Sequence, residues 1–245
     1  MWLFESFLVV HITTGAIGLV LFWIPALNRK GGNWHRRIGT WFARLMLVTA
    51  TMAMGMAITT MVDPITTHPR QVALNWSAER IQGIFGWMML YLAILTVQLV
   101  WHGVVSVRNK RNHAANRHPG NLALNGLTIV AAIACAIRGW QINEGLMMAF
   151  AIVGVASGLT NLRFIYTEAP GRLAYQLEHV KAIVGSGISV YTAFMAFGFV
   201  RFNPGQALNP RMWAIPLTVG LAMIIYHQAR IRLSLRSARV TPRTS

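Results

Sequence analysis

Seven long apolar stretches constrain what this chain can fold into more than any other feature. They cover residues 6–27, 38–62, 81–101, 122–137, 146–162, 174–200 and 212–233. Most approach the roughly 20 residues that a helix needs to cross a bilayer, and the short one at 122–137 suggests a tilted or partly sheltered helix. Turn signals such as Asp63-Pro64 separate them. The pattern predicts an all-α, polytopic membrane bundle of about seven transmembrane helices, forming a single domain over residues 1–245.

The composition agrees with lipid as the solvent of this chain. Only 11% of the residues are charged and 55% are hydrophobic, whereas an average soluble domain has about 25% charged residues. A soluble fold of this length is therefore excluded. The single cysteine, Cys135, excludes an intrachain disulfide and a cysteine-based metal site.

The charge distribution predicts an orientation. The chain has 22 Lys and Arg against 6 Asp and Glu, for a net charge of +16. In a soluble protein this balance would suggest nucleic acid, but beside apolar helices basic connections indicate cytoplasmic ends. Most basic residues share one side of the membrane when the N-terminus lies outside. We therefore expect an N-out, C-in protein of the bacterial inner membrane that binds no nucleic acid.

Two histidines near the N-terminus need an explanation. His11 shares a helix face with Gly15 and Gly18, so it is expected to face another helix rather than lipid. It is either a haem or metal ligand, a proton carrier, or a histidine bonded to that neighbour. His35 precedes Arg36 in a basic, tryptophan-rich segment. That segment is either an interfacial anchor or a contact for an anionic lipid head group or for cofactor carboxylates.

The segment "QLEHVKAIVGSG" places an acid, an imidazole and an amine where the sixth apolar stretch begins. We expect His179 to point into the bundle and to bond a side chain from another helix, with Arg163, Tyr166 and His227 as candidates. Glu178 is expected to cap the helix or to pair with Lys181.

Small residues follow the polar group in this segment. Gly185, Ser186 and Gly187 form a patch where a neighbouring helix is expected to pack closely.

Histidines on facing helices of a bundle are also how membrane proteins hold haem b. His227 and His179 lie in the inner halves of their predicted helices, and His102 ends the third stretch on the same side. Haem b is therefore a candidate cofactor, and a zinc or iron site is an alternative.

The chain resembles a bacterial family of multi-spanning membrane proteins, the predicted membrane proteins of the domain of unknown function 2306 series. Its C-terminal third carries the likeness: a helix-opening His179, then Gly185-Ser186-x-Ile188, then Thr192-Ala193-Phe194, and a closing helix with Trp213 and Pro216. His11 with Gly15, and His35-Arg36 with Gly39, look like its N-terminal elements. Gly187 and His227 depart from the family pattern. The resemblance implies a compact inner-membrane helical bundle, supports His11, His35 and His179, and implies no reaction.

Three classes of function agree with these features. The chain contains no HExxH, GxSxG, Walker or GxGxxG motif, and its acidic residues are dispersed. A non-catalytic membrane subunit, or a module that binds a lipid, a quinone or a partner protein, including a second copy of the chain, is therefore favoured over an enzyme. The alternatives are a haem-binding redox module and a transporter of a small solute or proton, although no inverted repeat is evident. The candidate binding residues are His11, His35, Arg163, Glu178, His179 and His227.

Overall fold

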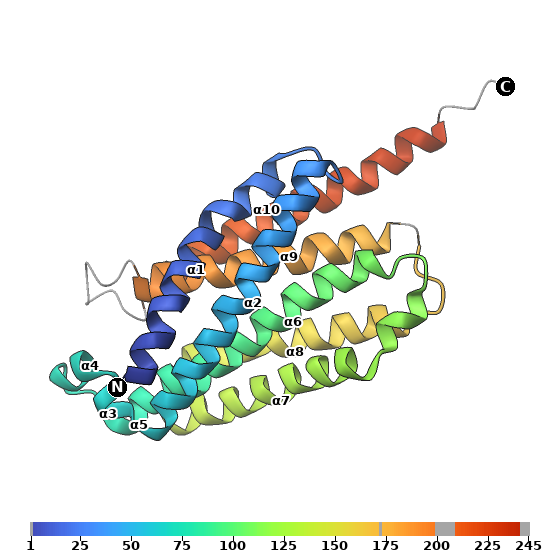
Figure 1. Cartoon of the computed structure of the whole chain (residues 1–245). Coiled ribbons are helices and arrows are strands. Elements are labelled where there is room, and N and C mark those ends of the chain that lie inside the picture. The colour runs from blue at the N-terminus through green and yellow to red at the C-terminus, as the bar shows by residue number, and fades with distance from the viewer. Residues whose placement is uncertain (1, 172, 199–208, 241–245) are drawn as a thin grey trace.

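A computed structural model describes residues 2–171, 173–198 and 209–240. Over these residues the chain is helical without a strand, and seven helices are long and apolar enough to cross a membrane (Figure 1). The long helices are α1 (Trp2–Leu27), α2 (Asn33–Val62), α6 (Met89–Arg108), α7 (Pro119–Gln141), α8 (Gly145–Tyr166), α9 (Ala174–Ala193) and α10 (Pro210–Val240). The predicted all-α class is confirmed, and the chain is built as a multi-pass membrane protein.

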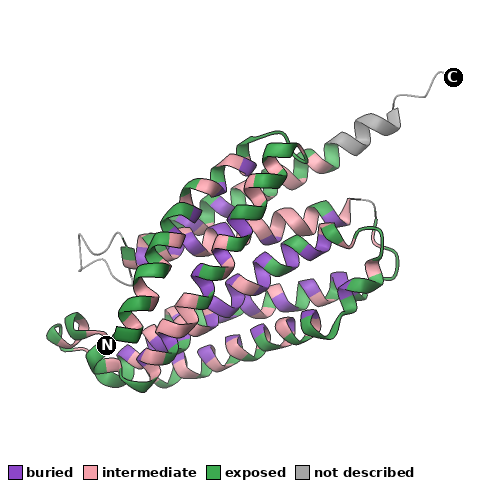
Figure 2. Cartoon of the chain, in the orientation of Figure 1, coloured by how far each residue is buried: buried purple, intermediate pink, exposed green. Residues whose placement is uncertain are grey.

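The third span is the centre of the bundle. It joins α5 (Ala78–Ile81), a π-helical stretch η1 (Gln82–Met88) and α6 into one continuous span, the most buried of the seven. It contacts α2, α7 and α9, and Figure 2 shows its buried residues in the middle of the molecule. The amide of Gln82 donates a hydrogen bond of 2.8 Å to the carbonyl of Met61 in α2, which ties the π-helical stretch to its neighbour.

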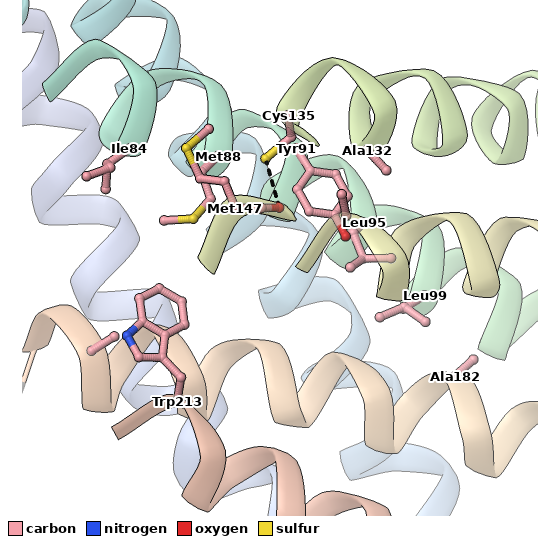
Figure 3. Packing of buried hydrophobic residues seen from close by; sticks show 12 residues of the cluster. Ile84, Met88, Tyr91, Leu95, Leu99, Ala132, Cys135, Met147, Ala182 and Trp213 are labelled. Carbon is pink, nitrogen blue, oxygen red and sulfur yellow. Dashed lines mark hydrogen bonds between the residues drawn. The ribbon is translucent and has the colours of Figure 1, made fainter. Parts of the chain in front are cut away.

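An apolar cluster fills the bundle between this central span and α7, α8 and α10 (Figure 3). Met88, Tyr91 and Leu95 meet Cys135 of α7 and Met147 of α8 there, all buried. The hydroxyl of Tyr91 donates to the carbonyl of residue 150 at 2.7 Å, so the one polar atom of this large side chain is satisfied. Dense packing of this kind leaves little space for water.

Several predicted boundaries were wrong. The fourth span is not short, because α7 extends over 23 residues from Pro119 to Gln141. Pro119 occupies the first helical turn, where its missing N–H is no loss, and the ring of His118 accepts a hydrogen bond from the N–H of Gly120. The connection after α2 also holds two short helices that were not predicted, α3 (Pro64–Thr67) and α4 (Pro69–Ala73). Residues 199 and 200 of the predicted sixth stretch lie outside the described residues.

Small residues bring helices together as predicted. A Cβ atom on Gly18 would lie 3.2 Å from the sulfur of Met46 in α2, and one on Gly187 would lie 2.3 Å from the ring of Phe22 in α1. Gly185 faces Leu99 of α6 at the looser distance of 3.4 Å. The patch in α9 therefore seats two different helices, and its tight contact is the one at Gly187.

The helices alternate in direction and define two ends of the bundle. We call the basic end the one that holds the α1–α2 turn, the α6–α7 connection with its short helix η2 (His113–Arg117), the α8–α9 connection and the described end of α10. In Figure 1 it lies toward the upper right, while the N-terminus and the short helices α3 to α5 lie at the opposite end. The polar residues discussed next belong to the basic end and to the half of the bundle beside it.

Candidate functional site

A lysine folds back over the end of α1. The turn between α1 and α2 requires Gly31, whose φ of 76° favours glycine. This turn lets the Lys30 amine bond the carbonyl of Pro25 at 2.9 Å and also the carbonyl of Ala26. Carbonyls at a helix C-terminus lack partners within the helix and attract cations. The amine is therefore held in place without any carboxylate.

Two histidines meet beside this lysine. The Nδ1 atom of His35 in α2 lies 3.0 Å from the carbonyl of Pro25, and Nδ1 of His179 in α9 lies 2.7 Å from the carbonyl of Gly103 in α6. A carbonyl only accepts, so each Nδ1 carries a proton and each neutral ring keeps its lone pair on Nε2. The two ring centres are 6.2 Å apart. The imidazoles are thus oriented by the main chain, with their Nε2 atoms available to a ligand.

The last span contributes two more basic groups. His227 and Arg230 of α10 lie close enough to Lys30 to interact with it electrostatically. Burial, followed by the charge of Arg230, lowers the pKa of Lys30. We call these five side chains, Lys30, His35, His179, His227 and Arg230, the basic cluster. In the described part of the chain, none of the five forms an ion pair with a carboxylate.

An apolar groove lies between α1, α9 and α10. Its cavity volume is about 140 Å³. It is lined by Phe22 and Trp23 of α1, by Val184, Gly187, Ile188 and Tyr191 of α9, by Met195 of the π-helical turn η3 (Phe194–Gly198) that follows α9, and by Ile215, Pro216, Val219, Gly220 and Met223 of α10. His227 continues the face formed by Met223 and Gly220, one helical turn closer to the basic end. The groove therefore leads from the bilayer interior toward the basic cluster.

Glu178 faces a different neighbour from His179. Its carboxylate lies 3.0 Å from Nε2 of His102 in α6 and 2.6 Å from the amine of Lys181. The predicted pairing with Lys181 is confirmed. The predicted capping role is wrong, because α9 begins at Ala174 and Glu178 lies beyond its first turn.

The predicted side-chain partners of His179 are also wrong. Its hydrogen bond goes to the main chain because Gly103 has no side chain to cover its carbonyl, and a Cβ atom there would lie 2.8 Å from Ile183. Arg163 is exposed on α8, and the ring of Tyr166 contacts Arg117 at 5.6 Å. The structure thus places His35, His179 and His227 around Lys30, which interacts electrostatically with all three. Arg163 is not part of this group.

His11 lies apart from these residues. Its Nδ1 donates to the carbonyl of Thr49 in α2 at 2.9 Å, which is the helix–helix contact expected from its glycine face. Sequence patterns could not reveal the carbonyls that orient His11, His35 and His179, because any residue supplies a carbonyl. The lysine after the first span was visible as a basic residue, but its fold back onto α1 was not.

The histidines do not assemble a metal centre with three protein ligands. Within the described ranges, no three His, Cys, Asp or Glu side chains are grouped so as to hold a metal ion. The rings of His35 and His179 are the closest pair of histidines in this region.

Comparison of the chain with protein-family profiles, with curated proteins and with solved structures finds no match. The resemblance to the 2306 series stays a prediction.

Proposed function

We propose that this protein is a non-catalytic binding module of the bacterial inner membrane that holds an anionic amphiphile from the cytoplasmic leaflet. The head group would lie at the basic cluster and one hydrocarbon chain in the apolar groove. The observation that carries the proposal is the position of the cluster at the inner end of the groove, where His227 follows Met223 on the same face of α10.

The charge of the site favours an anion. Each Lys or Arg near the membrane surface contributes roughly 1 kcal/mol to the attraction of an anionic lipid. Lys30 and Arg230 repel one another, and a phosphate between them would relieve that repulsion. The protonated Nδ1 atoms are already bound to carbonyls. A phosphate would therefore accept hydrogen bonds from Lys30 and Arg230, and from Nε2 of His35 or His179 only when these rings carry a second proton.

The volume of the groove favours a hydrocarbon chain over a large macrocycle. At about 140 Å³ it is smaller than the roughly 300–1,000 Å³ of pockets that enclose a drug-sized ligand. A haem would exceed this space, whereas a segment of an acyl or prenyl chain fits it. The groove is also lined by apolar side chains almost throughout, as a hydrocarbon requires.

One observation favours a second candidate function, the binding of a metal ion. With metal–nitrogen bonds of about 2.0–2.1 Å, an ion between two Nε2 atoms separates the ring centres by roughly 5–6 Å, depending on the angle at the metal. The ring centres of His35 and His179 are 6.2 Å apart, close to the upper end of that range. Ligating histidines usually donate their other N–H to a carbonyl or carboxylate, as both do here. Metal analysis of the purified protein, and of His35→Gln and His179→Gln, tests this candidate.

The proposed lipid site is tested with the full chain purified in a mild detergent. Short-chain phosphatidylglycerol, which is anionic, is added and the thermal midpoint of unfolding is recorded, with phosphatidylcholine as the zwitterionic comparison. Ligand that binds only the folded state raises the midpoint. We expect a larger rise with phosphatidylglycerol, and loss of that difference in the double variant Lys30→Gln, Arg230→Gln.

A matched control comes from the same end of the bundle. Arg163→Gln removes an exposed positive charge outside the basic cluster, so it should leave the preference for phosphatidylglycerol unchanged. Equal stabilisation by both lipids in the wild-type protein, or equal losses in the control and the double variant, would contradict the proposal.

A further inference from the structure

A layer of uncharged polar side chains lies inside the bundle, away from the apolar groove. The amide of Gln98 in α6 donates to the side-chain oxygen of Asn125 in α7 at 2.8 Å, and the hydroxyl of Ser157 in α8 donates to Gln98 at 3.2 Å. Gln98 and Asn125 are completely buried. Polar side chains inside membrane bundles usually mark functional sites, so this layer requires an explanation.

The same helices carry a second polar layer one turn closer to the basic end. His102 follows Gln98 by four residues in α6, and Asn161 follows Ser157 by four residues in α8. Both helices run toward the basic end, so the Gln98–Ser157 hydrogen bond brings His102 and Asn161 to the same level, about 6 Å further along. The ring of Phe164, also in α8, lies edge-on to that of His102 at 5.7 Å.

Within the part of the chain that the structure describes, three polar atoms in this second layer have no hydrogen-bond partner. They are Nδ1 of His102 and both side-chain amide atoms of Asn161. His102 is 1% exposed and Asn161 is fully buried. An unsatisfied buried polar atom costs roughly 1–3 kcal/mol, and a buried water molecule normally joins two to four such atoms. The amide of Asn161 and the imidazole of His102 therefore provide the partners that a buried water requires.

We propose that the layer between α6, α8 and α9 is a hydrated proton-binding site, in which a water held by Asn161 delivers protons to Nδ1 of His102. Glu178 accepts the hydrogen bond from Nε2–H of His102, so Nδ1 of the neutral ring carries the lone pair. A hydronium ion that reaches the layer gives its proton to Nδ1 and becomes the bound water. The resulting imidazolium faces the carboxylate of Glu178, which balances its charge.

Among the described residues, buried polar side chains connect this layer to one end of the bundle. Toward the basic end, the polar layer continues through the hydrogen bonds of Asn125, Asn121, Asn116 and Asn109. Toward the opposite end lies the apolar cluster of Tyr91, Leu95 and their neighbours (Figure 3). Protons therefore enter and leave from the basic end, and the site is not a pore.

Few other charges act on this histidine. Glu178 and Lys181 face it from α9, and the amine of Lys181 also lies 3.4 Å from the hydroxyl of Thr160 in α8. His113 of η2 lies across the ring of Phe164, and His179 is bonded to the carbonyl of Gly103, the next residue in α6. From α7, the side chain that hydrogen-bonds α6 beside this layer is the uncharged amide of Asn125.

The test uses the full chain in lipid bilayers with ¹⁵N-labelled histidine. The signals of His102 are identified by their loss in His102→Gln, and solid-state NMR then measures magnetisation transfer from water to its ring. We expect clear transfer in the wild-type protein and its loss in Asn161→Leu, which keeps the branched shape of the side chain but replaces both polar amide atoms with methyl groups. Thr128→Val is the matched control. It also replaces a buried polar side chain with an apolar one, but on α7, outside the proposed site, so it should show the same transfer as the wild-type protein.

A second measurement follows the charge of the ring with pH. Glu178→Gln keeps the shape of the site but removes its negative charge, so charging His102 should require at least about a tenfold higher proton concentration. Absence of water transfer to His102 in the wild-type protein overturns the proposal, whatever the variants do. Proton flux across vesicles that contain the protein, above that of protein-free vesicles, would overturn the one-sided site.

Discussion

His68 shows how one buried ring links the end opposite the basic end to pH. It lies in the connection after α2, between the rings of Phe85 at 4.2 Å and Phe4 at 5.5 Å. Burial lowers the pKa of His68 from 6.5 to about 4. The unfolded chain therefore binds this proton more tightly, so the stabilisation is complete above pH 6.5 and is lost as the pH falls toward 4. We expect the thermal midpoint to fall between pH 7.5 and pH 5, and to fall less in His68→Phe. Equal decreases in both proteins would contradict this origin.

Glu178 contacts two basic groups at once, His102 and Lys181, so its loss should destabilise the half of the bundle beside the basic end. Glu178→Ala leaves His102 and Lys181 without their shared partner. Hydrogen bonds to charged groups are worth roughly 1.5–3 kcal/mol, and partial exposure of both side chains places the expected loss near 2 kcal/mol. Denaturant unfolding in detergent measures this loss. Adding Lys181→Ala should cost less in the Glu178→Ala background than in the wild type, and additive losses would show that the pair is uncoupled.

The sequence identified the polar residues of the site better than it identified their hydrogen-bond partners. The histidines and Glu178 were identified because ionisable groups are rare in apolar stretches. The hydrogen bonds of His11, His35 and His179 go to carbonyls, and only the relative placement of helices decides which carbonyl is close. Arg163 was expected in the site because of its position near a helix end, but its side chain faces outward.

In α9, a glycine allows the close approach of α1. A Cβ atom on Gly187 would lie 2.3 Å from the ring of Phe22, so Gly187→Ala must displace that ring or push α1 and α9 apart. Overpacking of this kind costs roughly 1–3 kcal/mol. Gly126 of α7 has open space around its Cβ position, so Gly126→Ala should be neutral or slightly stabilising, as alanine favours helix. Thermal midpoints of the two variants in one detergent provide the comparison. Similar midpoints would mean that α1 moves freely against α9.

The helix boundaries agree with the predicted ones where hydropathy changes sharply. They differ where polar residues continue a helix or where the helix type changes. Hydropathy alone shortened the fourth stretch, because polar residues such as Asn121 and Arg138 lie inside α7 near its two ends. Asn121 is buried and donates to the carbonyl of Asn116, a contact that a single stretch does not reveal. The π-helical stretch from Gln82 to Met88 was not predicted either, because its sequence reads as ordinary apolar helix.

For the whole molecule, the distribution of basic residues predicts the orientation in the membrane. The basic end should be cytoplasmic because Lys and Arg are enriched on that side of inner-membrane proteins. A reporter fused after Ser245 should therefore be active only if it functions in the cytoplasm. Activity of a periplasm-dependent reporter at that position would reverse the orientation, and would place the basic cluster on the outer face.

The i,i+3 pair between Glu178 and Lys181 has a consequence for how the chain enters the membrane. A charged side chain at the centre of a helix raises the apparent cost of insertion by roughly 2.5–3.5 kcal/mol. Here the two opposite charges lie on the same helix, so they can neutralise one another in the nascent segment before any other helix is near. During insertion, α9 then carries a paired Glu178 and Lys181 with no net charge, and not two isolated ions. His102 lies in α6, which is synthesised and inserted before α9. The contact between His102 and Glu178 therefore forms when α9 packs laterally against α6 during biogenesis.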